Sequence, residues 1–245
     1  MNFRWKGHEL FVSQMSDQIW LACEKNQTIV TFFLTVSEQE IVKSLAGNKI
    51  SVKFDGGSEH SERKVAIFSW NEAACSDVVC LKSKYDSRFK TLKHPDVLGA
   101  LMNLGIERNQ LGDLIVEDDF VYIFTKESMA DYIASSCLQI GKCKMDFHRE
   151  YDVSFSHSNR EPIQIQVASV RLDCIVAALA HCSRSKANDK IRQGFVKVND
   201  IVLDESVNLC NNDFVSIRRV GRFQFLEVVS KTKKGRFNLR FDHFK

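Results

Sequence analysis

Five cations lie within the eighteen residues 183–200, in the segment SRSKANDKIRQGFVKVND. They are Arg184, Lys186, Lys190, Arg192 and Lys197. Lys186 and Lys190 stand four residues apart, so a helix would place these like charges side by side, at a cost of about 0.2–0.5 kcal/mol unless an anion is nearby. Such an array indicates a phosphate-binding surface, although a run of charge is more often a solvated face.

The charge of the chain is unevenly distributed along its 245 residues. Residues 167–245 carry 15 Lys and Arg against 8 Asp and Glu, a net charge of +7, whereas residues 1–166 carry 19 against 23, or −4. Such an imbalance indicates nucleic acid or an anionic membrane surface as the partner. RNA is favoured, because the cations alternate with strand and turn residues and lack the wide apolar face of an interfacial helix. Few aromatic residues accompany them, which favours recognition of phosphates and RNA shape over base stacking.

A second basic cluster lies near the end of the chain, in the segment KTKKGRFNLRF. Lys231, Lys233, Lys234 and Arg236 surround Gly235, between the apolar runs FLEVV and FNLRF. Two strand-like runs joined by a segment containing glycine predict a hairpin with a basic tip. We expect this tip to share one face with the cations of residues 183–200.

The elements that position these cations are two helices and a small sheet. The segment RLDCIVAALAHC has a helical apolar stripe, and Ser183 or Ser185 can cap a second helix that ends at Gly194. The segments FVKVND, IVLDES and DFVSIRRVGRFQFLEVV then alternate as short strands. The Asn199-Asp200 and Asn211-Asn212 pairs suit turns, because these residues tolerate left-handed backbone.

For the first 150 residues, the sequence predicts two helices followed by an α+β unit. Residues 8–24 have helical spacing, and a second helix is expected from an N-cap at Ser37 to a C-cap at Gly47. The segments KISVKFDGG, ERKVAIFSW and DVVCLKSKY predict three strands of one small sheet. Later segments add two helices and two strands, which predicts helices on one face of a sheet. The expected parts are a helical segment 1–48, an α+β (RRM-like) domain 49–150, a polar linker 151–166 and a basic domain 167–245.

The basic domain resembles the S4 domain, a small RNA-binding fold of two helices and an antiparallel sheet. The residues that carry the resemblance are Arg171-Leu172-Asp173, Ser183 to Ala187, Ile191, Gly194, Val196, Val198, Asn199, Asp213 and Ile217-Arg218. The chain departs from the family pattern at Asn212, where the family usually has glycine. Asparagine also tolerates a left-handed turn, so the fold is still expected.

Longer stretches resemble the bacterial YlmH-type S4 proteins, which are related to the photosystem II S4 proteins. The resemblance covers roughly residues 35–245 and rests on VKFDGG, TLKHPDVLGALMNLGIERNQLGDLIV and KTKKGR. It implies a ribosome-associated factor that contacts large-subunit rRNA and tRNA and is linked to the rescue of obstructed large subunits. The candidate RNA-binding residues in the basic domain are Arg171, Ser183, Arg184, Ser185, Lys186, Lys190, Arg192, Lys197, Asn199, Arg218, Arg219, Arg222, Lys231, Lys233, Lys234 and Arg236. Second-domain candidates are Gly56, Gly57, Arg63 and His94.

Enzymatic activity is the minority interpretation. Asp173 lies on the expected first helix of the S4-like domain, where it would more often stabilise the helix start or pair with a nearby cation than act as a nucleophile. Two alternatives remain, an RNA-modifying enzyme with its active site in residues 50–150 and an adaptor that recruits a protein. A deep pocket lined by His94, Asp113 or Glu62 would favour the enzyme.

The eight cysteines include no Cys-x-x-Cys pair, so we expect reduced thiols with no metal, no disulfide and no cofactor. The sequence shows no signal peptide and no apolar stretch long enough to span a membrane. We therefore expect a cytoplasmic monomer whose partners are RNA and the large ribosomal subunit, with no membrane partner.

Overall fold

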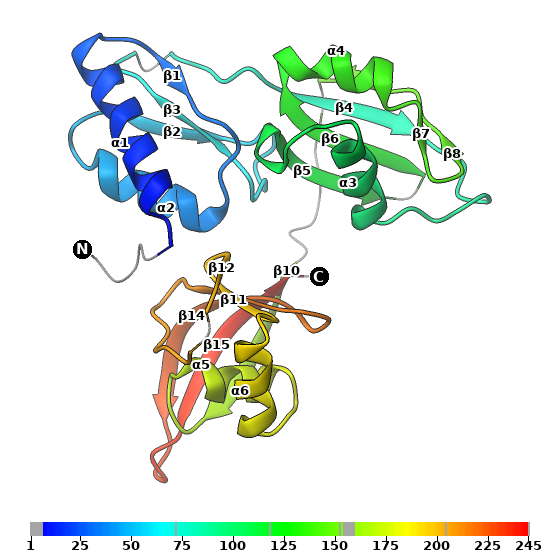
Figure 1. The fold of residues 1–245 in the computed structure, drawn as a ribbon. Coiled ribbons are helices and arrows are strands. Elements are labelled where there is room, and N and C mark those ends of the chain that lie inside the picture. The colour runs from blue at the N-terminus through cyan, green and yellow to red at the C-terminus, as the bar shows by residue number, and fades with distance from the viewer. Residues whose placement is uncertain are drawn as a thin grey trace. The chain divides into compact units, whose positions relative to one another are not determined.

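The chain forms two compact units, residues 1–156 and 157–245 (Figure 1). The structure is a computed structural model that describes residues 7–71, 73–117, 119–151, 153, 160–203 and 205–244. Helices and antiparallel sheets occur in both units, which confirms the expected α+β class. Within the described residues, no helix is long and apolar enough to cross a membrane.

The first unit begins with two helices packed on a three-stranded sheet. The helices are α1 (Glu9–Glu24) and α2 (Val36–Ala46). The sheet has the order β1-β3-β2 and consists of β1 (Ile29–Val30), β2 (Val52–Asp55) and β3 (Val65–Phe68). The N-cap of α2 is Thr35 and not Ser37, because the Thr35 hydroxyl accepts from the Glu38 backbone N–H while the Glu38 carboxylate accepts from the Thr35 N–H at 2.7 Å. Gly47 ends the helix as expected.

One prediction about these strands is wrong. Only the first two of the three expected strands, β2 and β3, share a sheet, and their third partner is β1. Ile50, Ala66 and Phe68 pack in one core with Met15 of α1 and Leu34. A domain boundary at residue 48 would therefore divide a single hydrophobic core.

The rest of the first unit is a β-α-β-β-α-β arrangement. Its main elements are β4 (Val78–Lys84), α3 (His94–Asn103), β5 (Leu111–Glu117), β6 (Phe120–Lys126), α4 (Glu127–Ser136) and β9 (His148–Glu150). The 3-10 turn Arg108–Gln110 precedes β5, and the small hairpin of β7 (Gln139–Ile140) and β8 (Cys143–Lys144) precedes β9. The strand order is β5-β6-β4-β9, with antiparallel neighbours throughout. This is the topology of ferredoxin-like folds.

Both helices of this part cover the same face of the sheet. Val97 and Leu101 of α3 and Ile133 of α4 share a buried core with Leu81 of β4 and Ile123 of β6. Because successive strand residues point to opposite faces, the neighbours of Leu81 and Ile123 lie on the other face. The helices do not cover that face, on which Cys80 and Phe124 are buried and Tyr122 is half-buried.

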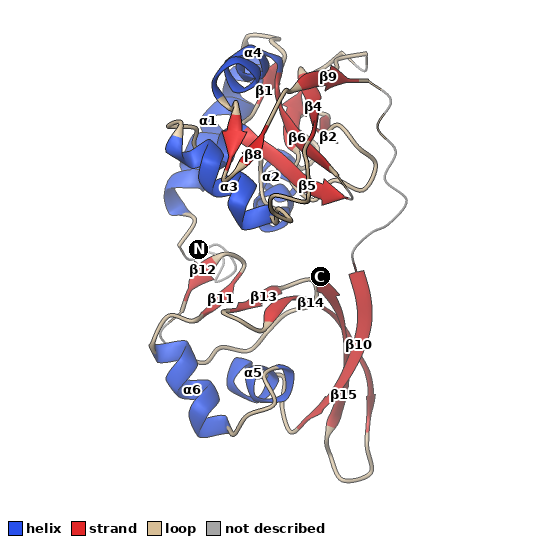
Figure 2. Ribbon diagram, turned by 90° about the vertical axis from the view of Figure 1, so that its right-hand side faces the viewer, coloured by secondary structure: helices blue, strands red, loops and turns tan. Residues whose placement is uncertain are grey.

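The second unit is a six-stranded antiparallel sheet with two helices (Figure 2). The helices are α5 (Leu172–Leu179) and α6 (Arg184–Arg192). The strands are β10 (Arg160–Val167), β11 (Val196–Val198), β12 (Ile201–Val202), β13 (Phe214–Ile217), β14 (Gly221–Lys231) and β15 (Phe237–Phe244), in the order β10-β15-β14-β13-β11-β12. The left-handed backbone expected at Asn199, Asp200 and Asn212 is present, with φ values of 51°, 67° and 70°.

The predicted linker, residues 151–166, extends too far toward the C-terminus. Most of its second half, from residue 160, is β10, which pairs with β15 from Arg160↔Phe244 to Val167↔Phe237. Ile163 and Ile165 pack against the core of the second unit. A strand at the edge of a sheet tolerates proline and alternate polar residues, which is why the segment resembles a linker in composition.

Candidate nucleic-acid interface

Helix α6 begins at the first cation of the basic segment and is capped by the residue before it. The Ser183 hydroxyl oxygen accepts a hydrogen bond from the Lys186 backbone N–H at 3.3 Å. Of the two expected N-cap candidates, Ser183 and Ser185, the N-cap is therefore Ser183. Its hydroxyl satisfies one of the unpaired N–H groups of the first turn. Ser185 lies exposed in that turn. The cap therefore fixes Arg184 as the first residue of the helix.

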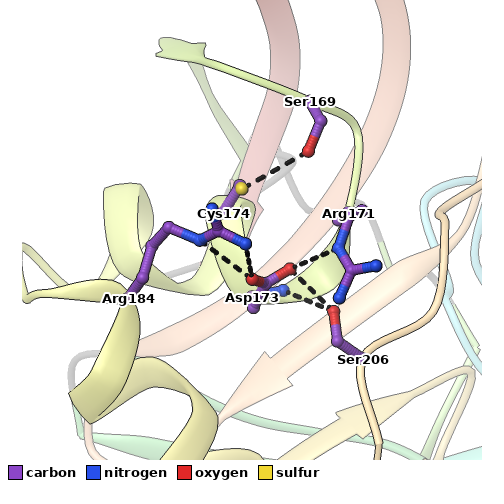
Figure 3. A network of polar contacts seen from close by, with 6 residues as sticks. All are labelled: Ser169, Arg171, Asp173, Cys174, Arg184 and Ser206. Atoms are coloured by element: carbon purple, nitrogen blue, oxygen red, sulfur yellow. Dashed lines mark hydrogen bonds and ion pairs between the residues drawn. The ribbon is translucent and has the colours of Figure 1, made fainter.

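A carboxylate at the start of α5 holds the first cation of α6 in place (Figure 3). The Asp173 side chain is only 1% exposed. Its Oδ1 accepts hydrogen bonds from Arg171 Nε at 3.0 Å and from the Ser206 hydroxyl at 2.8 Å. Its Oδ2 accepts from Arg184 Nε at 3.0 Å and also contacts Arg184 Nη2. Asp173 thus pairs with nearby cations, as the interpretation of its sequence position suggested.

The network keeps Asp173 ionised and both arginines accessible. Burial raises the pKa of the Asp173 carboxyl, but hydrogen bonds from Arg184, Ser206 and Arg171 outweigh burial and lower the pKa from 3.8 to about 2. The Arg171 and Arg184 side chains remain 49% and 61% exposed. A guanidinium has five N–H donors, and Asp173 takes one from Arg171 and two from Arg184. The remaining donors are suited to an external anion.

Phe195 connects the end of α6 to the turn between β13 and β14. Its N–H donates to the Lys190 carbonyl at 2.9 Å, and its carbonyl accepts from the Arg218 N–H at 2.9 Å. The Arg218 guanidinium lies 5.2 Å from the Phe195 ring centroid, within the range of a cation–π contact. We define the α6 basic group as Arg184, Lys186, Lys190, Arg192, Lys197, Arg218 and Arg219. All of these are exposed except Lys190, which is half-buried.

The basic tip of the β14–β15 hairpin is a second, separate group. Lys231, Lys233, Lys234 and Arg236 are exposed there, and Gly235 turns the chain with φ of 77°. Pairing of β14 with β13 ends at Gln224↔Phe214, whereas its pairing with β15 continues to Lys231↔Phe237. The hairpin therefore extends past β13, and β10 still pairs with β15 there, as far as Val167↔Phe237. Figures 1 and 2 both show the hairpin tip on the other side of α5 from α6. The expectation of one continuous face is wrong.

Two predicted RNA-binding residues make contacts inside the second unit. The Asn199 amide donates to Asp213 Oδ1 and accepts from the Phe214 N–H, both at 2.9 Å. The half-buried Arg222 guanidinium lies 4.8 Å from the Phe214 ring centroid and 5.6 Å from that of Phe244. Both side chains therefore stabilise the sheet.

The second-domain candidates lie near the junction between the two parts of the first unit. Arg63 Nη2 donates to the Phe33 carbonyl at 2.9 Å and Arg63 Nε to the Leu111 carbonyl at 3.1 Å. The Asp113 carboxylate accepts from the backbone N–H groups of Glu62 and Arg63, at 2.7 and 3.1 Å. The Arg63 side chain thus joins the two parts of the unit.

The remaining candidates of the first unit differ in exposure. Gly56 is buried, and a Cβ atom there would lie 2.4 Å from the Ser61 Cβ. Gly57 is exposed, and His94 is exposed at the start of α3. A pocket of about 310 Å3 in this unit is lined by a different set of residues: Lys82, Lys84, Phe120, Asp146, His148, Arg149 and Glu150.

No group of three metal-ligating side chains occurs among the residues that the structure describes.

Ser206 is a residue of the candidate interface that the sequence did not predict. It follows Asp173 by 33 residues, and its hydroxyl both donates to the Asp173 carboxylate and accepts from the Asp173 N–H at 3.0 Å. Nothing in the local sequence around Ser206 signals that contact.

The fold and the basic groups define a two-unit α+β protein whose exposed cations suit an RNA partner. Residues 76–152 match the family model described as "Putative RNA-binding domain in YlmH". These residues are therefore similar to the RNA-binding domain of YlmH, and the resemblance to YlmH-type proteins is confirmed.

Two relatives extend the comparison beyond that domain. The chain is 28% identical over 251 residues to the "Ribosome-associated protein quality control protein P2" of Bacillus subtilis (strain 168), covering 98% of this chain and 96% of the relative. The solved structure of the "Cell division protein ylmH from Streptococcus pneumoniae" matches with a TM-score of 0.52 at 18% identity, covering 61% of this chain and 93% of that chain. The structural match shows a shared fold.

Proposed function

We propose that this chain is a non-catalytic protein that binds structured RNA, namely rRNA and tRNA, on large ribosomal subunits. In this proposal it acts in translation or ribosome quality control, as a cytoplasmic monomer. The name of the Bacillus subtilis relative, which aligns over nearly its full length, supports a role at the ribosome. The family match of residues 76–152 supports RNA as the ligand.

The observation that carries the proposal is the α6 basic group with its buried anchor. Exposed cations alone are commonly a solvated face. Here, however, a carboxylate that is 1% exposed holds Arg184 and Arg171 by hydrogen bonds, so part of the conformational entropy of these side chains is already lost before RNA binds. Such preorganisation favours binding of phosphate oxygens, which position a protein on RNA without reading its sequence.

Cosedimentation of the purified full chain with isolated ribosomal subunits tests the proposal. We expect the chain to sediment with large subunits, and the double variant Lys186→Glu/Lys190→Glu to lose most of this association. The matched control is Lys25→Glu/Lys49→Glu, which reverses two exposed lysines of the first unit that lie outside residues 76–152 and should sediment as the wild type does.

Two results would contradict the proposal. The first is a wild-type chain that stays in the supernatant with large subunits present. The second is equal sedimentation of the Lys186→Glu/Lys190→Glu variant and the control, which would place the α6 basic group outside the interface.

A further inference from the structure

The face of the four-stranded sheet that has no helices carries two aromatic rings beside two lysines. Lys82 is paired with Tyr122, and Lys84 with Phe120, across the β4–β6 ladder. Directly paired residues point to the same face of a sheet. The helices pack on the opposite face, where Leu81 and Ile123 are buried, so the four side chains share the face without helices.

The rings and the lysines are in contact with one another. Phe120 and Tyr122 are half-buried, with ring centroids 6.3 Å apart and planes inclined by 41°. Lys82 Nζ lies 4.9 Å from the Phe120 centroid and 5.5 Å from that of Tyr122. Lys84 Nζ lies 5.9 Å from the Phe120 centroid. We call Lys82, Lys84, Phe120 and Tyr122 the aromatic face.

A pocket of about 310 Å3 opens beside the aromatic face and is lined by Lys82, Lys84 and Phe120 together with residues 146 and 148–150. This volume is within the range of about 300–1,000 Å3 typical of small-ligand sites. Its acidic groups have partners, since Lys82 Nζ lies 2.8 Å from Glu150 Oε2 and His148 Nε2 lies 3.0 Å from Asp146 Oδ2. The pocket thus offers hydrogen-bond donors and acceptors next to an aromatic surface.

We propose that the aromatic face binds an unpaired RNA segment, whose bases stack on Phe120 and Tyr122 while Lys82 and Lys84 contact its phosphates. Every base has a π-face, so stacking on a protein ring tolerates any sequence. Lysines beside the rings are complementary to the backbone charge of the same strand. Bases within a duplex are stacked on each other and are not accessible to such rings.

This inference rests on the proposed function and adds a second mode of RNA binding to it. The α6 basic group, with few aromatic residues, suits the phosphates of structured RNA. The aromatic face suits unpaired bases. The two surfaces are on different units of the chain, so their contributions are separable by mutation.

Fluorescence anisotropy of the full chain with a labelled single-stranded RNA heptamer tests the aromatic face. The variant Phe120→Leu/Tyr122→Leu keeps apolar side chains but removes both rings. We expect it to bind the heptamer at least about tenfold more weakly, since stacking on one ring contributes about 5- to 150-fold in affinity. The variant Phe120→Tyr/Tyr122→Phe keeps both rings and should bind like the wild type.

Two controls define the origin of the effect. Tyr132→Leu removes an aromatic ring that is 45% exposed on α4, on the helical side of the same domain, and should leave heptamer affinity unchanged. A heptamer that lacks its bases should bind wild-type protein and the Phe120→Leu/Tyr122→Leu variant equally weakly.

Two results would overturn the aromatic face as a stacking site. One is equal binding of the intact heptamer by wild-type protein and the Phe120→Leu/Tyr122→Leu variant. The other is no measurable binding of the heptamer by wild-type protein. The proposed function is judged separately, by sedimentation with large subunits. The Lys186→Glu/Lys190→Glu variant should lose that sedimentation and still bind the heptamer through the intact aromatic face.

Discussion

Replacement of Asp173 by asparagine should destabilise the second unit by about 2.5 kcal/mol. The pKa of the Asp173 carboxyl is lowered from 3.8 to about 2, and one pKa unit corresponds to about 1.4 kcal/mol. Asparagine keeps the size of the side chain but removes the charge that Arg184 and Arg171 stabilise. Because both arginines are about half exposed, water can solvate them in the variant, so the loss should remain below the 3–5 kcal/mol typical of a fully buried broken pair.

Urea unfolding followed by two signals measures this loss in the full chain. All three Trp and all four Tyr precede residue 157, so Trp fluorescence reports the first unit only. Far-UV circular dichroism reports both units. With an m value of about 1–3 kcal/mol/M, Asp173→Asn should lower the midpoint of the second-unit transition by about 0.8–2.5 M urea. The fluorescence transition should not move.

The matched control is Asp189→Asn, which removes an exposed carboxylate from α6 and should change stability by less than about 0.5 kcal/mol. If Asp173→Asn unfolds at the same urea concentration as this control, the carboxylate does not hold the helices together. A shift of the Trp transition by Asp173→Asn would show that the effect is not local. The double variant Asp173→Asn/Arg184→Gln should be less destabilised than the sum of its single variants, because they remove the same contact.

The stability of the second unit should depend on pH because of the lowered pKa of Asp173. A carboxyl whose pKa is lower in the folded protein stabilises the fold fully above about pH 4, and that contribution is lost as the pH falls through about 2. Asp173→Asn should therefore flatten the loss of second-unit stability in this range. A variant that loses stability with acid as steeply as the wild type would assign the effect to other carboxyls.

Three further outcomes are expected. Lys186→Glu/Lys190→Glu should weaken the binding of structured RNA similarly across sequences and flatten the slope of log affinity against log salt by about one to two, as measured by filter binding at several salt concentrations. An unaltered slope would make these lysines a solvated face. A fragment of residues 157–245 should unfold cooperatively, whereas residues 168–245 should not, because they lack β10 and its pairing with β15; equal thermal transitions would contradict this. Gly57→Ala should destabilise the first unit by about 2–4 kcal/mol in Trp-monitored urea unfolding, because φ is 81° and the new Cβ would lie 2.7 Å from a Phe124 ring atom; an unchanged midpoint would refute that reason.

The local sequence was sufficient to predict those features that depend on neighbouring residues. Ser183 was a predicted cap of α6, and the alternation of VKV predicted β11. The Asn199-Asp200 turn followed from residues that tolerate left-handed backbone. The excess of cations in the last third of the chain is a property of composition, and the exposed cations of α6 and the hairpin follow from it.

Tertiary structure alone decided which distant segments meet. β3 pairs with the two-residue strand β1, and the polar segment 160–167 is an edge strand of the second sheet, because strand pairing depends on partners that local composition does not specify. The contact between Asp173 and Ser206 spans 33 residues, and the pairing of Lys82 with Tyr122 spans 40. The aromatic face was therefore invisible in the sequence, although Phe120 and Tyr122 alternate in their strand. Periodicity shows that two rings share a face, but only the folded sheet determines whether helices, lysines or solvent cover that face.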